Sequence, residues 1–226
     1  IDVLVEDKNL DFILFQDGDI CMLEKKSGKL TNLLPASLKD GVIVDNRTFY
    51  LGTNSGLVRF TRPANGSNEF EVKWIPELKF RNYSVEYDTG DKALYVATVN
   101  GLFRLDSLNR IEAVLYENEP IFSSSITYHE NRLYVPLTQS GILILEHGEP
   151  VQKIQPVLNG KKPIVFKLLV YENSIYAHTD EGICQFTMAI ISEHSTAQEE
   201  KPPDAYLILR SPTTSYGSVI PMGCRP

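Results

Sequence analysis

Short apolar runs alternate with polar turns along most of the chain, and one such unit repeats. The unit is a Tyr-containing strand, a polar turn that ends in Gly, and an apolar return strand. Four copies end their turns at Gly56, Gly101, Gly141 and Gly182, which lie 45, 40 and 41 residues apart. A weaker copy covers residues 12–23. A period of about 40 to 45 residues with several short strands per unit is typical of a β-propeller.

Each unit predicts four antiparallel strands. The first strands are expected at residues 42–44, 84–87, 124–128 and 165–171, each followed by a turn rich in Asp, Asn or Glu. The Tyr strand and the Gly turn come next, because Gly adopts the positive φ that a tight hairpin needs. Outer strands are expected at 69–75, 111–115 and 151–154. No window shows the 3.6-residue apolar period of a helix. The sequence predicts an all-β fold, a β-propeller of four-stranded antiparallel blades with about five blades in this chain.

The domain limits follow from the repeats. A β-propeller, or part of one, is expected over residues 1–195. Its repeats are expected near 1–40, 41–80, 81–120, 121–160 and 161–195. Residues 192–204 are polar and contain a Pro-Pro pair, which is typical of a linker. Residues 206–209 are strand-like and either start a new unit or supply the last outer strand. The chain starts in a strand-like pattern without an initiator Met, so we interpret it as a segment of a longer protein.

One unit departs from the others in length. The segment from Tyr134 to Gly141 is one residue longer than its counterparts and contains Pro136. Proline cannot donate a hydrogen bond to a neighbouring strand, and an extra residue in a strand forms a bulge. We therefore expect a β-bulge near Pro136.

Charge and composition exclude some partners. The 226 residues carry a net charge of −7 with a pI near 5.2, which disfavours binding to nucleic acid or to an anionic membrane. No apolar run reaches the roughly 18 residues that span a bilayer. The cysteines Cys21, Cys184 and Cys224 form no CxxC pair, and the first two are expected to be buried core residues.

The sequence offers no catalytic or metal-binding motif. The histidines have no metal-ligand spacing, and His129 and His147 are expected in exposed turns. His178 and Cys184 flank one hairpin and could face each other, but a nucleophilic pair also needs a third group to orient the base. Phosphate- and dinucleotide-binding motifs are absent. We therefore predict no catalytic residue, no metal and no cofactor, and the ligand-binding residues stay unknown.

Acidic residues leave one enzymatic alternative open. A glycosidase needs two carboxylates that converge on one bond, and some five-bladed propellers are glycosidases. Asp2, Asp45 and Asp88 recur near the first strands of their units. Each also lies beside a turn, and the capping of turns is the favoured interpretation.

The aromatic residues are a second open question. Tyr50, Tyr95, Tyr134 and Tyr176 occupy equivalent positions, and packing between blades is the favoured interpretation. A rim that combined aromatics with Asn and Asp would suit a sugar or a protein partner. The candidates for such a rim are Trp74, Tyr83, Tyr87, Tyr116, Phe122 and Tyr128.

The units at residues 50–60 and 95–105 closely resemble the two-component-regulator propeller repeat. That repeat has an aromatic strand, Gly-Thr, a short polar turn, Gly-Leu and an apolar strand with Arg. The resemblance is good over residues 41–186 and weak over 1–40. It implies a seven-bladed propeller outside the inner membrane of a bacterial sensor, as in many gut Bacteroides. The family Trp is replaced by other residues in this chain, namely Phe49, Leu94, Leu133 and Ile175, and His178 and Leu137 stand where Gly-Thr would begin.

In that family a three-tyrosine Ig-like domain, a membrane helix and a histidine kinase follow the propeller. Residues 201–209 resemble the start of the Ig-like domain, so residues 196–226 are expected to hold a linker and that start. The resemblance implies a non-catalytic ligand-sensing ectodomain, periplasmic or extracellular, that binds an oligosaccharide, forms a homodimer and signals to a kinase outside this chain. A propeller scaffold for protein interactions is the alternative, and a glycoside-processing enzyme is the third.

Overall fold

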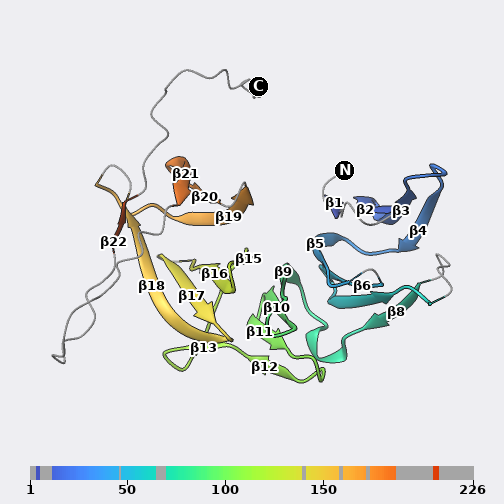
Figure 1. Ribbon diagram of the computed structural model, residues 1–226, viewed down its shortest axis with the longest axis horizontal. Helices are drawn as coiled ribbons and strands as arrows, with labels where there is room; N and C mark the ends of the chain where they lie inside the picture. The colour runs from blue at the N-terminus through green and yellow to red at the C-terminus, as the bar shows by residue number, and fades with distance from the viewer. Residues whose placement is uncertain are drawn as a thin grey trace, which may run out of the picture.

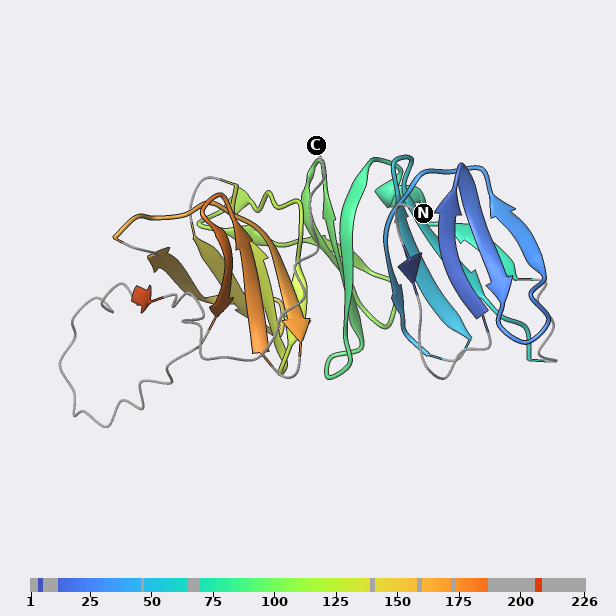
Figure 2. The same cartoon turned by 90° about the horizontal axis from the view of Figure 1, so that it is seen from above.

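Five β-sheets of three to five strands stand side by side in an open arc, and a two-stranded sheet lies beside them (Figures 1 and 2). The computed structural model describes residues 4–5, 12–45, 47–64, 70–138, 141–157, 160–171, 174–186 and 206–208. The first strands of the first four sheets lie on the inner side of the arc, and their last strands lie on the outer side. The predicted all-β propeller architecture with four-stranded antiparallel blades is confirmed.

The first three blades each contain four antiparallel strands. The first blade joins β1 (Leu4–Val5), β2 (Phe12–Asp17), β3 (Asp19–Glu24) and β4 (Leu30–Leu34). The second joins β5 (Leu38–Ile43), β6 (Thr48–Thr53), β7 (Leu57–Thr61) and β8 (Glu71–Trp74). A short 3-10 helix, η1 (Pro76–Leu78), leads to the third, with β9 (Asn82–Asp88), β10 (Ala93–Thr98), β11 (Gly101–Leu105) and β12 (Ile111–Ala113).

A hairpin of β13 (Leu115–Tyr116) and β14 (Glu119–Pro120) precedes the fourth blade. That blade has β15 (Thr127–His129), β16 (Arg132–Pro136), β17 (Ile142–Glu146) and β18 (Glu149–Val157). The fifth has β19 (Val165–Tyr171), β20 (Ser174–Thr179) and β21 (Gly182–Phe186). Within the strand-like segment 206–209, residues 206–208 form β22 (Tyr206–Ile208), which pairs in parallel with β18 of the fourth blade. The rest of the predicted segment 196–226 lies outside the described residues.

Each blade packs one apolar face against the next blade. Because side chains alternate along a strand, every sheet has a face toward the preceding blade and a face toward the following one. Tyr50 lies in the core between the second and third blades, Tyr95 between the third and fourth, and Tyr134 between the fourth and fifth. The expected packing role of these tyrosines is confirmed. Tyr176, at the equivalent position of the fifth blade, is only partly buried.

The repeated Thr-x-x-Gly motif closes the central hairpin of three blades. In each, the Thr hydroxyl donates to the Gly carbonyl oxygen over 2.8 Å: Thr53 to Gly56, Thr98 to Gly101, and Thr179 to Gly182. The same hydroxyl accepts an amide N–H from the loop at 3.1 to 3.2 Å. The three glycines have positive φ values of 149°, 123° and 116°, as the sequence predicted.

The extra residue of the fourth blade lengthens a loop. The prediction of a bulge at Pro136 is wrong, because β16 and β17 pair in unbroken register up to Pro136 and Ile142. The amide of Leu137 donates to the Gly141 carbonyl at 3.0 Å, so this loop holds three residues where the other units hold two. Leu137 takes the place of the Thr and has no hydroxyl with which to close the shorter loop.

Polar side chains link the inner strands of successive blades. An oxygen of the Asp40 carboxylate on β5 accepts bonds from the Ser84 hydroxyl at 2.7 Å and the Val85 amide at 3.0 Å, both on β9. The Ser84 oxygen also accepts the Ile126 amide beside β15, at 3.3 Å. The Thr127 hydroxyl then donates to the Leu168 carbonyl on β19 at 2.9 Å. These bonds join the second to fifth blades at the inner edge.

Candidate ligand-binding groove

The β13–β14 hairpin is an insertion between the third and fourth blades. Its two central residues, Glu117 and Asn118, both have positive φ, at 55° and 65°. This is the pattern of a type I′ turn, whose twist matches that of a two-stranded ribbon. Tyr116 pairs with Glu119 across the hairpin, so the turn fixes the backbone from which the Tyr116 side chain projects.

A cavity of about 560 Å³ lies between this hairpin and the β17–β18 turn. Its size falls within the range of small-ligand sites, about 300 to 1,000 Å³. Seven of the twelve residues that line it have planar polar side chains: Arg104, Glu112, Tyr116, Glu117, Asn118, His147 and Glu149. These groups offer both hydrogen-bond donors and acceptors beside one aromatic ring.

A second cavity, of about 550 Å³, is lined by residues of the same hairpin and by the segment that follows it. Tyr116 also lines this cavity, together with Glu119, the exposed Phe122 and Lys153. The Lys153 ammonium lies 5.6 Å from the centre of the Tyr116 ring, within cation–π range. We call the two cavities together the hairpin groove, and Tyr116 is shared by both.

The insertion enlarges a feature that the repeats share. Tyr50 faces Arg59 across strands β6 and β7, and Tyr95 faces Arg104 across β10 and β11. Beside Arg59, between the second and third blades, the equivalent cavity measures about 250 Å³. Beside Arg104 the cavity is more than twice as large, and residues of the inserted hairpin form one of its walls.

The charges of the groove are coupled to the third blade. His147 Nδ1 lies 2.9 Å from Oδ1 of Asp91, and Arg104 Nη2 lies 3.7 Å from Oδ2 of the same carboxylate. The hydrogen bond to Asp91 and its negative charge raise the pKa of His147 above 6.5. Asp91 therefore favours the protonated form of His147 at the edge of the groove.

A buried carboxyl group lies near the inner edge of the arc. Glu86 on β9 is mostly buried, and its burial together with the nearby charge of Asp40 raises its pKa to about 8. The backbone of Tyr128 and the charge of Lys167 on β19 act in the opposite direction. Sequence reasoning did not single out Glu86 or Asp40. Each is one of several polar residues in the first strand of its blade, so the sequence pattern did not mark either of them.

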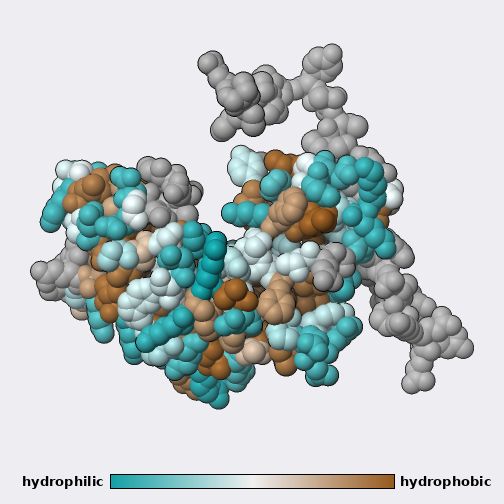
Figure 3. Space-filling view, turned by 180° about the vertical axis from the view of Figure 1, so that it is seen from behind, coloured by the Kyte–Doolittle hydropathy of each residue, from teal (hydrophilic) through white to brown (hydrophobic). Residues whose placement is uncertain are grey.

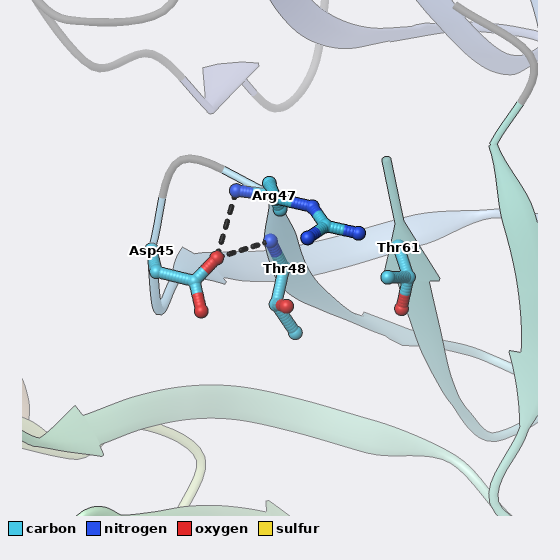
Figure 4. A pocket seen from close by; sticks show the side chains of 4 residues that line it. All are labelled: Asp45, Arg47, Thr48 and Thr61. Carbon is cyan, nitrogen blue, oxygen red and sulfur yellow. Dashed lines mark hydrogen bonds between the residues drawn. The ribbon is translucent and has the colours of Figure 1, made fainter. Parts of the chain in front are cut away.

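The acidic residues that the sequence did single out cap turns. One oxygen of Asp45 accepts the amide N–H groups of Arg47 and Thr48 at 2.7 Å each, beside a cavity of about 530 Å³ (Figure 4). One oxygen of Asp88 accepts the amides of Gly90 and Asp91. The favoured turn-capping interpretation is confirmed for both residues, and Asp2 lies outside the described residues.

Oδ1 of Asp88 also accepts a hydrogen bond from the Tyr128 hydroxyl of the fourth blade at 2.6 Å. Burial of the phenol and this bond raise the pKa of Tyr128 to about 12. Asp88 therefore stabilises the structure, since its hydrogen bonds hold the turn after β9 and the Tyr128 side chain of the next blade.

The possible Cys–His pair is not assembled. Cys184 lies opposite Ala177, whereas His178 lies opposite Ile183, so the two side chains point to opposite faces of the sheet. Cys184 is buried and His178 is exposed beside the Phe166 ring. Cys21 is buried as well, as predicted, and burial raises the pKa of both thiols. Cys224 lies outside the described residues.

The remaining histidines differ in exposure. His147 is 78% exposed, as predicted, but the side chain of His129 is only 14% exposed at the end of β15, so the prediction of a surface position for His129 is wrong. His194 lies outside the described residues. Within the ranges that the structure describes, no three His, Cys, Asp or Glu side chains gather as metal ligands would.

The aromatic candidates do not share one face. Tyr116 and Phe122 meet in the hairpin groove, and Tyr87 lines the smaller cavity beside Arg59. Tyr83 lies beneath the guanidinium of Arg81, 5.2 Å from its carbon, and Trp74 packs against the core between the first two blades. Tyr116 and Phe122 were both among the candidates from the sequence, but no pattern in the sequence predicted that they line the same cavity.

Solved structures with the same fold include extracellular sensor domains. The extracellular domain of BT4673 from B. thetaiotaomicron, assigned to a hybrid two component system, matches with a TM-score of 0.64 and 15% identity over 91% of this chain and 28% of that one. A second structure of this extracellular domain, assigned to a one component system, matches with a TM-score of 0.60 and 16% identity. That match covers 82% of this chain and 26% of the other. The WD40 propeller domain of Doa1 matches with a TM-score of 0.51 and 12% identity, over 66% of this chain and 51% of the other.

These likenesses show the propeller fold, and the chain spans about a quarter of the length of the BT4673 chains. They agree with the resemblance of the repeats to the two-component-regulator propeller repeat. No protein-family model matches the chain, and no curated protein does. In the part of the chain that the structure describes, no helix has the length and apolar character needed to cross a bilayer.

Proposed function

We propose that this chain is part of the extracellular or periplasmic ectodomain of a two-component sensor, and that it binds a carbohydrate in the hairpin groove. The observation that carries the proposal is that Tyr116 lines two neighbouring cavities, each of which also has polar side chains in its walls. The likeness to the extracellular domains of BT4673 supports the sensor role. We assign no chemical step to the groove.

The chemistry of the groove suits a sugar. A pyranose has an apolar C–H face that packs on an aromatic ring, and hydroxyl groups around its edge that both donate and accept hydrogen bonds. Tyr116 supplies the ring. Glu112 and Asn118 accept hydrogen bonds, and Arg104 donates them. The two cavities that Tyr116 lines give room for more than one sugar unit.

The position of the groove suits signalling. Its walls come from the third blade, the inserted hairpin and the fourth blade. A ligand that binds there would contact both blades and would favour one arrangement of them. A signal to a kinase requires such differential affinity for two states of the sensor. A homodimer of the sensor region is part of this proposal.

A thermal-shift screen of the purified chain against oligosaccharides tests the proposal. A ligand present at 100 times its Kd, and bound only to the folded chain, adds about 2.7 kcal/mol of stability. We expect a selective upward shift in Tm with no release of sugar. Tyr116→Ala should weaken the binding of that ligand by about 0.5 to 1.5 kcal/mol, or roughly 2- to 12-fold.

Tyr83→Ala provides the matched control, because Tyr83 is an aromatic residue outside both cavities. It should leave the affinity unchanged. A shift that survives Tyr116→Ala would place the ligand elsewhere, and sugar release would favour the glycosidase alternative. A panel without any shift would contradict carbohydrate binding and favour a protein partner.

A further inference from the structure

The cavity of about 250 Å³ between the second and third blades shares no lining residue with the hairpin groove. We call it the Arg59 cavity. All of the residues that line it belong to these two adjacent blades. Its volume lies just below the range of about 300 to 1,000 Å³ in which drug-sized ligands bind, so it has room for a molecule with few non-hydrogen atoms.

The arginine that lines this cavity has no carboxylate partner. Within the part of the chain that the structure describes, Arg59 forms no ion pair, and its Nε is buried without a hydrogen-bond partner. The Nε of Arg104, its counterpart in the third blade, is also buried without a partner, but Arg104 Nη2 lies 3.7 Å from the Asp91 carboxylate. A charge withdrawn from water needs an opposite charge or hydrogen bonds in exchange. Arg59 therefore has an unused capacity to bind an anion.

The charge around the Arg59 cavity is positive. Lys92 lines the cavity, is exposed, and likewise has no carboxylate partner among the described residues. The one carboxylate in the lining, Asp106, already has a partner, because Arg110 Nη2 lies 2.7 Å from its Oδ2. Asp45, in the turn before β6, caps that turn. Arg59 and Lys92 thus leave an excess of positive charge in a chain whose net charge is −7.

Two phenol groups line the cavity together with Arg59. Tyr50 faces Arg59 across β6 and β7, and Tyr87 extends from β9 of the third blade. Burial, and next the charge of Asp45, raise the pKa of Tyr87, so its hydroxyl keeps its proton and can donate a hydrogen bond. Apolar side chains such as Leu94 complete the walls. The surface of the central blades has the same mixed character, with hydrophilic residues among hydrophobic ones (Figure 3).

We propose that the Arg59 cavity binds a small oxyanion, namely a carboxylate, phosphate or sulfate group on a molecule no larger than about one sugar ring. The planar guanidinium of Arg59 can donate two parallel hydrogen bonds to two oxygens of such a group. Lys92 supplies a second positive charge, and the Tyr87 hydroxyl supplies a further donor. The site does not depend on the proposed binding of a carbohydrate in the hairpin groove.

A proton–nitrogen NMR titration of the purified chain tests the proposal. The probes are sodium galacturonate, phosphate and sulfate, each at the same pH and ionic strength. We expect at least one of them to cause saturable shifts of the Arg59 Nε–H signal and of the backbone amides at residues 92 and 106–109. Saturation by galacturonate alone would assign a carboxylate ligand, and saturation by phosphate or sulfate a tetrahedral one. Methyl galactoside, the neutral counterpart of galacturonate, should cause no saturable shift at these positions.

Variants of the two cations test their roles. Arg59→Gln should weaken binding of the saturating anion by at least tenfold, because it removes hydrogen bonds from a charged donor. Lys92→Gln should weaken it by about two- to fivefold, as expected for an exposed charge. Since Lys92 is exposed, this variant tests the proposal even if melting shows that Arg59→Gln does not fold. Arg81→Gln is the matched control, because Arg81 is exposed and lies outside the cavity, and it should leave the affinity unchanged.

Several results would overturn the proposal. One is a chain that none of the three anions saturates, and another is equal binding of methyl galactoside at the same positions. A third is a Lys92→Gln variant, or a folded Arg59→Gln variant, that binds the anion as tightly as the wild type. Shifts confined to residues 112–122 and 147–153 would place the anion in the hairpin groove and would also contradict the proposal.

Discussion

Replacement of Glu86 by Gln should stabilise the protein at alkaline pH and have little effect at acidic pH. Burial and the charge of Asp40 raise the pKa of Glu86 to about 8 in the folded chain, against 4.5 for an unperturbed carboxyl. Between these two pH values the folded chain holds a proton that the unfolded chain releases. Stability therefore falls as the pH rises through this window, because the folded state binds more protons. Gln keeps the shape of the neutral acid and cannot ionise.

The difference between the two pKa values sets an upper bound on the effect. At about 1.4 kcal/mol for each pH unit, it corresponds to at most about 5 kcal/mol above pH 8. Below pH 4.5 the carboxyl group is protonated in both states, and its contribution to the difference vanishes. A gain of even 2 kcal/mol would be a large part of the 5 to 15 kcal/mol that separates folded from unfolded states in typical domains.

Urea denaturation of the wild type and Glu86→Gln at pH 4.5, 6, 7 and 8.5 measures the effect. The difference in unfolding free energy between the two proteins should grow steadily with pH, since groups that do not interact with Glu86 contribute equally to both proteins. Glu71→Gln, at an exposed position on β8, is the matched control and should show no such trend. A difference between wild type and Glu86→Gln that does not change with pH would refute the assignment of a buried, protonated Glu86.

Three further predictions concern the bonds between and within blades. Asp40→Ala removes the acceptor for Ser84 and Val85, so urea denaturation should show a loss of about 2 kcal/mol; an unchanged midpoint would contradict the inner link. Thr98→Val removes the hydroxyl that closes a hairpin and should cost about 1 kcal/mol, with faster amide exchange at Asn100; unchanged exchange would argue against this role. The His147–Asp91 contact should stabilise the fold below pH 6.5 and lose its effect as the pH rises through the raised pKa of His147. NMR titration should find that the pKa of His147 is above 6.5 in the wild type and lower in Asp91→Asn. Equal pKa values in the two proteins would contradict the pairing.

The repeat made most of the fold predictable. A Gly with positive φ, a Thr that closes the loop and a Tyr that packs on the next blade recur at fixed positions, so local chemistry and tertiary packing both point to one architecture. The prediction failed where the repeat changes. At Pro136 an extra residue can enter a strand or a loop, and only the register of β16 with β17 decides between them. His129 looked like a turn residue, although it ends a strand and is mostly buried.

The groove was less predictable than the fold. Its ring and its polar walls come from segments more than thirty residues apart, Tyr116 in the hairpin and His147 in the β17–β18 turn. The sequence listed Tyr116 as one aromatic residue among several, and periodicity gives no account of an insertion. The turn residues Asp45 and Asp88 drew attention because they recur, yet recurrence in a repeat protein marks what builds each blade. Apart from Arg104, the counterpart of Arg59, the residues that line the groove have no equivalent in the other units, because they belong to the inserted hairpin and to the β17–β18 turn.

Hydrogen exchange on the chain with and without a bound oligosaccharide is the most direct test of ligand binding in the hairpin groove. The ligand is the one that gives the largest thermal shift in the screen. The account predicts slower exchange of backbone amides at residues 112–122 and 147–153, with little change at β19 and β20. Protection confined to the inner strands, or to the faces at the two ends of the arc, would contradict the assignment of the groove as the ligand site.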